Sequence, residues 1–254
     1  MVVLNAGSFG LTISSAMVIA FCITAVWWLV CTLPLLKSYR QQAYTEYTGS
    51  ALTASFRRLG KTFREVRKEK HIVLYLVAFF FFIDGVYTII GMATAYGSSL
   101  GLDSTGLLLA LLVTQIVAFP FAILFGRLAQ KYSSEKLIAV CIVAYFGIAV
   151  FAVFLRSQWQ FWLLAVLVGM FQGGIQALSR SYFTRIIPPE QSGEYFGLMD
   201  ICGKGAAFLG TTLVSAISQF SGSMSTGVGM IAVLFVIGFA LFRMAAKCEA
   251  PTRD

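Results

Sequence analysis

The chain has 254 residues, of which 58% are hydrophobic and only 12% are charged, and its net charge is +8. A soluble domain of this length needs far more polar residues to cover its surface, so the composition excludes an ordinary soluble protein. The basic residues lie between apolar runs, which indicates membrane topology rather than nucleic-acid binding. The sequence predicts an integral membrane protein whose main partner is the lipid bilayer.

Seven apolar runs have close to the ~20 residues that a helix needs to cross a bilayer. They are 11–36, 72–95, 105–125, 137–155, 159–178, 195–218 and 226–246. The runs are too long for barrel strands, so we predict an all-α transmembrane fold with seven membrane-spanning helices. We expect a first helix (1–36), a basic cytoplasmic loop (37–71), a six-helix bundle (72–246) and a cytoplasmic tail (247–254).

The loop 37–71 contains the segment ALTASFRRLGKTFREVRKEK, in which apolar residues recur at helical spacing between basic residues. This pattern predicts an amphipathic helix that lies on the inner leaflet of the membrane. A solvated basic linker is the alternative.

Lys and Arg residues are divided unequally between the two sides that alternating spans define. Seventeen fall on one side and Arg156 alone on the other, while Lys204 lies inside a span. The positive-inside rule then predicts an external N-terminus and a cytoplasmic C-terminus. The six spans after the basic loop divide into two three-span units of opposite orientation, a pattern that is typical of transporters.

Ionisable side chains inside apolar spans are expensive, at roughly 2.5–3.5 kcal/mol each on insertion scales, and usually mark functional sites. Asp84 and Lys204 both lie deep in their spans, which predicts a buried ion pair or two separate substrate contacts. Asp200 lies four residues before Lys204 and offers it a competing partner. Gln172 and Gln176 share a helix face and favour either cavity lining or interhelical hydrogen bonds. We predict that these five residues line a substrate or proton pathway.

Several other residues inside the spans carry weaker expectations. Gly173 and Gly174 predict close helix approach or a bend. Tyr87 and Thr88 are predicted to line an outer vestibule, and Trp159 is predicted to belong to an interfacial aromatic belt.

Two short connections at the predicted cytoplasmic side carry further candidates. In GRLAQKYSSEK, Arg127, Lys131 and Lys136 can bind phosphates or acidic groups, or serve only as positive-inside anchors. Gly126 is expected to allow close packing where its span ends. The second connection, 179–194, is predicted to be a charged hairpin, and its ionisable residues are Arg180, Arg185, Glu190 and Glu194.

Catalytic and metal chemistry receives no support from the composition. His71 is the only histidine, and the five cysteines form no CxxC pair. A single histidine argues against a histidine-based metal cluster and a Ser-His-Asp triad, and we predict that the protein has no cofactor and is not an enzyme.

Two longer stretches resemble a known family. GRLAQKYSSEK resembles a degenerate form of the loop motif GxxxDRxGRR of the major facilitator superfamily, with Gln130 in place of the acidic residue. FFFFIDGVYTIIGMATAYG and GGIQALSRSYFTRIIPPEQSGEYFG resemble the vacuole effluxer-like family, the autophagy-related protein twenty-two group. The resemblance implies twelve spans, alternating access and, for eukaryotic members, amino-acid efflux. This chain would then supply spans six to twelve, the carboxyl-terminal half.

We therefore predict the carboxyl-terminal half of a secondary transporter that moves a small polar solute across a bacterial plasma membrane or a eukaryotic vacuolar membrane. A missing amino-terminal half is its expected partner. One alternative is a seven-helix receptor or sensor, although a retinal protein needs its lysine on the last helix and Lys204 lies on the sixth. The other alternative is an inactive transporter fragment.

Overall fold

The computed structural model describes residues 10, 12–39 and 51–248. The described residues form helices and turns and contain no strand. Seven of the described helices are long and apolar enough to cross a membrane, which confirms the predicted all-α fold. Residues 40–50 of the predicted basic loop and 249–254 of the predicted tail lie outside the described residues. The chain forms two units, 1–51 and 52–254.

The first unit contains one long helix, α1, from Ile13 to Ser38. The helix begins where the Thr12 hydroxyl accepts a hydrogen bond of 3.2 Å from the Ser15 amide. Its large apolar side chains are exposed along the whole length, including Trp27 and Trp28 at 68% and 71%. An exposed helix that is apolar on every side is suited to contact with lipid rather than with water.

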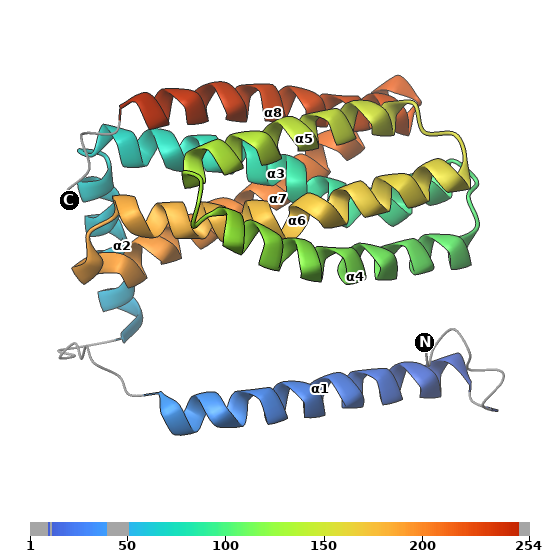
Figure 1. Ribbon diagram of the computed structural model, residues 1–254, viewed down its shortest axis with the longest axis horizontal. Coiled ribbons are helices and arrows are strands. Elements are labelled where there is room, and N and C mark those ends of the chain that lie inside the picture. The colour runs from blue at the N-terminus through green and yellow to red at the C-terminus, as the bar shows by residue number, and fades with distance from the viewer. Residues whose placement is uncertain (1–9, 11, 40–50, 249–254) are drawn as a thin grey trace. The chain divides into compact units, whose positions relative to one another are not determined.

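The second unit contains a short helix, α2, and six long helices. Their bounds are α2 Ala51–Val66, α3 Lys70–Ser99, α4 Ser104–Leu128, α5 Ser134–Val153, α6 Gln158–Ile186, α7 Ser192–Ser221 and α8 Met224–Lys247. The six long helices lie side by side, and α2 runs across the end of the bundle where α3 begins (Figure 1). Helix α6 continues to Ile186 and α7 begins at Ser192, so most of the predicted hairpin 179–194 is helical.

The packing of the six long helices interlocks the two predicted three-span units. Helix α3 packs against α7 and α8, and α6 packs against α4 and α5, while α5 and α8 pack against each other. If α3, α4 and α5 are exchanged for α6, α7 and α8, the contact of α3 with α7 becomes that of α6 with α4, and the contact of α3 with α8 becomes that of α6 with α5. The contact between α5 and α8 is unchanged by the exchange. The contact between α7 and α8 has no counterpart of similar extent. This exchange is the pattern that two inverted repeats produce.

Glycines bring these helices close together. A Cβ on Gly169 would lie 2.6 Å from the backbone oxygen of Thr114, and a Cβ on Gly173 would lie 2.9 Å from the Ala122 side chain, so α6 touches α4 at the backbone. The two glycines are one helical turn apart, as in GxxxG contacts between membrane helices. The close approach predicted at Gly173 is therefore confirmed.

Two buried tyrosines fix helix α3 near its ends. The Tyr75 hydroxyl donates to the backbone oxygen of Ser179 on α6 at 2.7 Å. The Tyr96 hydroxyl donates to the backbone oxygen of Ala152 on α5 at 2.8 Å. The hydroxyl of Ser225 on α8 lies 3.1 Å from the Tyr96 hydroxyl. Because the phenol has a single proton, Ser225 must be the donor in the last contact. Helix α3 is thereby joined to three other helices.

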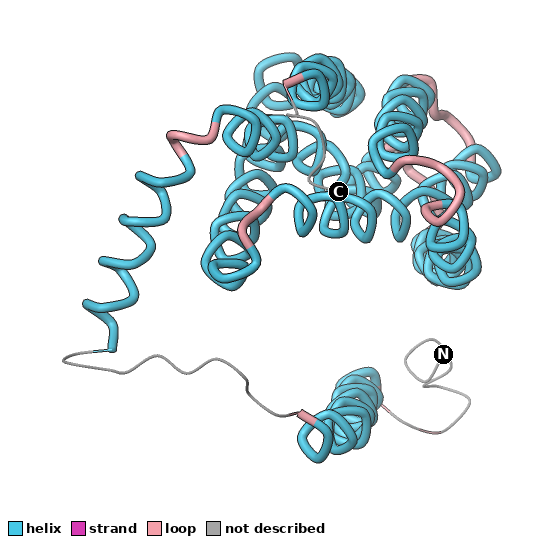
Figure 2. Tube along the Cα trace, turned by 60° about the vertical axis from the view of Figure 1, so that its left-hand side comes forward, coloured by secondary structure: helices cyan, strands magenta, loops and turns pink. Residues whose placement is uncertain are grey.

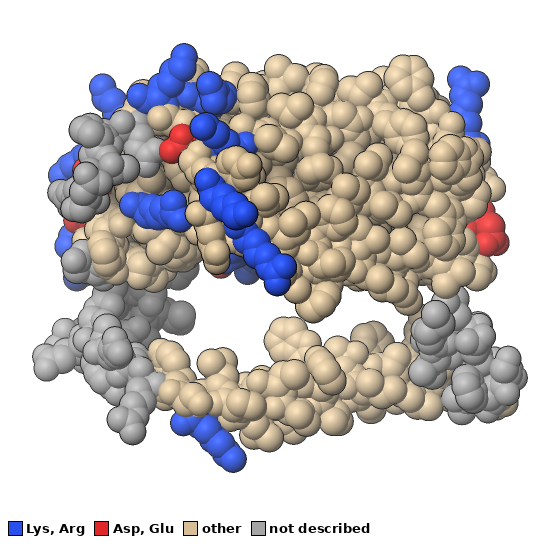
Figure 3. Space-filling view, in the orientation of Figure 1, with Lys and Arg blue, Asp and Glu red and all other residues tan. Residues whose placement is uncertain are grey.

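Basic side chains gather at one end of the second unit, which we call the basic end. Figure 3 shows them over the end of the bundle where α3 begins and α8 finishes. The last turns of α4, α6 and α8 contribute Arg127, Arg185 and Lys247. At the other end, the connection between α5 and α6 carries Arg156.

Candidate functional site

A buried carboxyl group lies at the middle of helix α3. Asp84 is 1% exposed and accepts a hydrogen bond of 3.2 Å from the Thr88 hydroxyl, one turn further along the helix. It lies 14 residues after Lys70, or about 21 Å at 1.5 Å per residue, in a helix of 30 residues. A methyl group on Gly210 of α7 would overlap both the Asp84 carboxylate and the Thr88 hydroxyl. Asp84 therefore faces α7, and Gly210 makes room for it.

The predicted ion pair between Asp84 and Lys204 is not formed. None of the ion pairs among the described residues includes Asp84 or Lys204, and Lys204 is exposed on α7. Lys204 and Gly210 are six residues apart, which is ~1.7 turns, so they lie on different faces of α7. Asp84 meets the Gly210 face, and Lys204 points away from it.

Asp200 pairs with Arg180 of α6 rather than with Lys204. The guanidinium donates to the Asp200 carboxylate at 2.7 Å, and the two side chains are 53% and 47% exposed. Lys204 follows Asp200 by one turn of α7. Tyr87 of α3 lies close to the same stretch of α7, since its ring would be 3.7 Å from a Cβ on Gly203. We call Arg180, Asp200 and Lys204 the charge group.

The two glutamines of α6 have different surroundings. Gln172 lines a cavity of about 30 Å³ together with Thr114 and Gln115 of α4 and Ile89 of α3. Its Oε1 is buried and has no hydrogen-bond partner among the described residues. The volume suits about one water molecule, which would satisfy the amide oxygen. Gln172 is therefore a cavity-lining residue, whereas Gln176 is half-buried and lines neither of the two cavities described in this section.

The basic connection between α4 and α5 is open rather than closely packed. Arg127, Lys131 and Lys136 are all exposed. A Cβ on Gly126 would meet nothing within 4 Å, so the expectation that this glycine permits close packing is wrong. The basic residues remain available to solvent or headgroups.

The remaining ionisable candidates lie between α6 and α7. Arg185 is exposed in the last turn of α6. Glu194 accepts a hydrogen bond from Thr62 of α2, so it joins the short helix to the first turn of α7. The side chain of Glu190 lies outside the described residues.

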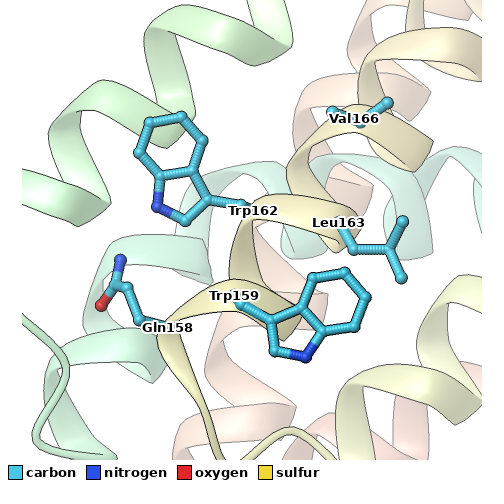
Figure 4. A pocket seen from close by; sticks show the side chains of 5 residues that line it. All are labelled: Gln158, Trp159, Trp162, Leu163 and Val166. Carbon is cyan, nitrogen blue, oxygen red and sulfur yellow. The ribbon is translucent and has the colours of Figure 1, made fainter.

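A second hollow lies at the opposite end of the bundle from the basic residues. It has a volume of about 480 Å³, and Figure 4 shows the side chains that line it along the first turns of α6. These are Gln158, Trp159, Trp162, Leu163 and Val166. The lining contains two indole rings and no ionisable group. An apolar, open hollow of this kind matches an aromatic belt better than a polar solute site.

Three of the site's features were missed or misplaced by sequence reasoning. Thr88 is buried against Asp84 rather than in an outer vestibule, although its spacing of four residues predicts that contact. The Gly210 contact and the Arg180 partner of Asp200 depend on which helix faces meet. The described residues contain no group of His, Cys, Asp and Glu side chains that could hold a metal ion.

The fold and the site define a multi-pass α-helical membrane protein with ionisable groups inside membrane-length helices. A family model described as "Vacuole effluxer Atg22 like" matches residues 1–250, so the chain belongs to that family. This match confirms the resemblance drawn from the two stretches around Asp84 and Arg180.

Individual relatives cover most of this chain. The "Uncharacterized MFS-type transporter YxiO" of Bacillus subtilis is 42% identical over 93% of this chain and 55% of its own length. "Autophagy-related protein 22" of Coccidioides immitis is 24% identical over 85% of the chain and 40% of its own length. "Autophagy-related protein 22-1" of Penicillium rubens is 26% identical over 85% and 41%. The chain thus spans about half the length of the curated relatives it matches. Relatives with these names favour a transporter over an enzyme.

Proposed function

We propose that this chain is the carboxyl-terminal half of a secondary active transporter for a small polar solute. The observation that carries the proposal is the buried Asp84 at the middle of a membrane-length helix, facing the helix that bears Asp200 and Lys204. A carboxyl group at this depth is costly and is retained where it has a functional role. The Atg22-like family and the interlocked helix packing support the same function.

We assign Asp84 and Asp200 different roles. Asp84 is shielded between α3 and α7, so it suits a proton or small cation that moves when these helices separate. The charge group is half-exposed and presents both signs of charge, so it suits a solute that carries an ammonium and a carboxylate. An amino acid is such a solute. Gln172 would add a neutral contact.

The missing part of the transporter is the expected partner of this half. Substrate sites in such transporters lie between two repeats near the midplane. We therefore expect this chain to insert alone but to move solute only together with an amino-terminal half. A chimera in which this chain replaces the matching part of YxiO tests the function in proteoliposomes. Saturable amino-acid transport by the chimera supports the proposal; saturable transport by the chain alone contradicts the division into halves.

The inactive-fragment and receptor alternatives give different results in the same experiment. A chimera that inserts and folds but transports no small polar solute would favour an inactive fragment. The family membership favours a transporter over a seven-helix receptor or sensor.

We propose that the basic end faces the cytoplasm. The membrane would be the plasma membrane of a bacterium or the vacuolar membrane of a fungus. In a chain whose native cysteines are serines, a membrane-impermeant thiol reagent should reach a cysteine at Ser99 from outside. A cysteine at Ser133 should react only after permeabilisation, because the two exposed positions lie at opposite ends of the bundle. The reverse pattern of labelling would invert the orientation.

Neutralising either partner of the Arg180–Asp200 pair should impair transport more than folding. The pair is half-exposed, so its loss should change the free energy of unfolding by only about 0–1 kcal/mol. We expect Arg180→Gln and Asp200→Asn each to lower solute transport by the chimera, with melting temperatures within a few degrees of the wild type. The exchanged double variant, Arg180→Asp with Asp200→Arg, should fold but stay inactive because the solute meets charges at reversed positions. Recovery of transport in the exchanged variant would mean that the pair only holds α6 to α7.

A further inference from the structure

Helix α2 ends three residues before α3, a helix long and apolar enough to cross a membrane. Only residues 67–69 separate Val66 from Lys70, the first residue of α3. The turn between them is closed by backbone hydrogen bonds from Lys68 to Glu65 and from Glu69 to Val66, at 2.9 and 3.0 Å. Helix α2 runs crosswise to the long helices, and its first turns project beyond the bundle in both views (Figures 1 and 2). A helix that runs crosswise to membrane-spanning helices at their ends would lie along the membrane surface.

One face of α2 is attached to the bundle. Thr62 is fully buried and donates a hydrogen bond to the Glu194 carboxylate of α7. Val66 is 3% exposed and belongs to the hydrophobic core of the second unit. Leu59, on the same side of the helix, is half-buried. These contacts fix the rotation of α2 about its own axis.

The opposite face of α2 carries three exposed basic residues in a row. Arg57, Lys61 and Arg64 follow each other at spacings of four and three, so they share one side of the helix. The Lys61 side chain is 73% exposed and forms a surface ion pair of 3.7 Å with Glu65, one turn further along the same helix. Phe63 is 54% exposed and lies between the basic row and the attached face. An exposed aromatic ring beside a basic row at the membrane surface matches the chemistry of lipid headgroups above an acyl boundary.

We propose that α2 is a docking surface for anionic lipid headgroups, bound by Arg57, Lys61 and Arg64, with Phe63 inserted at the acyl boundary. Each basic residue near an anionic surface strengthens binding about fivefold, so the row contributes on the order of a hundredfold. Thr62 and Glu194 connect the docked helix to the first turn of α7. Anionic lipid therefore acts on the helix that carries Asp200 and Lys204. Lipid docking itself does not rest on the proposed transport function.

The experiment places a fluorophore on α2 and varies the lipid. Gly60 is exposed, and a Cβ there would meet nothing within 4 Å, so Gly60→Cys in a chain without other cysteines accepts an environment-sensitive dye. The labelled chain is placed in nanodiscs of phosphatidylcholine alone or with added phosphatidylglycerol. We expect the dye emission to shift to the blue with the anionic lipid, and the shift to disappear in high salt.

Two variants that each lose three positive charges distinguish specific lipid binding by α2 from a general electrostatic attraction between the protein and the membrane. Arg57→Gln, Lys61→Gln and Arg64→Gln together should abolish the lipid-dependent shift. Arg127→Gln, Lys131→Gln and Lys136→Gln together should preserve it, because they lie on the α4–α5 connection. All six positions are exposed, so both variants should melt like the wild type.

Three outcomes would overturn the proposal. The emission is the same in neutral and anionic nanodiscs, or the α2 variant responds like the wild type, or inorganic phosphate added to neutral nanodiscs reproduces the shift. The first outcome would mean that the protein alone holds α2, and the third would mean that the row binds free phosphate rather than lipid.

Discussion

Replacement of Gly169 by leucine is expected to prevent most of the protein from folding. A Cβ at this position would lie 2.6 Å from the backbone oxygen of Thr114 and 3.1 Å from the Val117 side chain. The Thr114 oxygen belongs to the α4 backbone and cannot turn aside, and Thr114 also bonds α6 through a 3.2 Å hydrogen bond from its hydroxyl to Ala165. Overpacking of this kind costs about 1–3 kcal/mol or more, and here it separates the two helices along their length.

The measurement is the yield of monodisperse protein and its melting temperature in detergent. Gly147→Leu is the matched control, because Gly147 is exposed on α5 and a Cβ there would meet nothing within 4 Å. The control should melt like the wild type. Equal behaviour of the two variants, whether both fold or both fail, would contradict the backbone contact between α4 and α6.

Asp84→Asn is expected to leave the fold intact and to reduce solute transport by the chimera to background. The amide has the shape of the carboxyl group, so it still accepts the hydrogen bond from Thr88 and fits the space beside Gly210 of α7. It has no ionised form, so any step that binds or releases a proton or cation at this position is lost. The yield and melting temperature of the variant should match those of the wild type.

Asp103→Asn is the control that makes the same chemical change outside the membrane-spanning core. Asp103 caps α4 by accepting a 2.7 Å hydrogen bond from the Gly106 amide, and asparagine caps helices about equally well. This variant should fold and transport normally. If Asp84→Asn transports at the wild-type rate, then Asp84 serves only to join α3 to α7, and the charge group remains the candidate solute site.

The helices could be predicted from the sequence because one physical requirement, a hydrocarbon layer about 30 Å thick, sets both their length and their apolarity. The ends of the helices could not be predicted in this way. Hydropathy falls at Ser179, where the charged residues begin, yet α6 continues to Ile186 because its backbone hydrogen bonds do not depend on side-chain polarity. For that reason Arg180 was assigned to a hairpin, although it lies within a helix and pairs with Asp200.

Partners inside the membrane depended on which faces of two helices meet. The depths of Asp84 and Lys204 in their spans favoured a pair, but depth alone does not define the rotation of α7. Gly210 faces Asp84 instead, because only a residue without a side chain fits there. The Thr88 contact needed no tertiary information, since a hydroxyl four residues from a carboxyl on one helix lies beside it.

The two tyrosines that fix α3 have a mechanical consequence. Tyr75 and Tyr96 are 21 residues apart, or about 32 Å along the helix, a separation that matches the thickness of a hydrocarbon layer of about 30 Å. A rod tethered near both ends tilts as a whole and bends little at its centre. Helix α3 should therefore stay fixed within the six-helix bundle. Helix α7, which meets Asp84 through a glycine, should be the helix that moves against it.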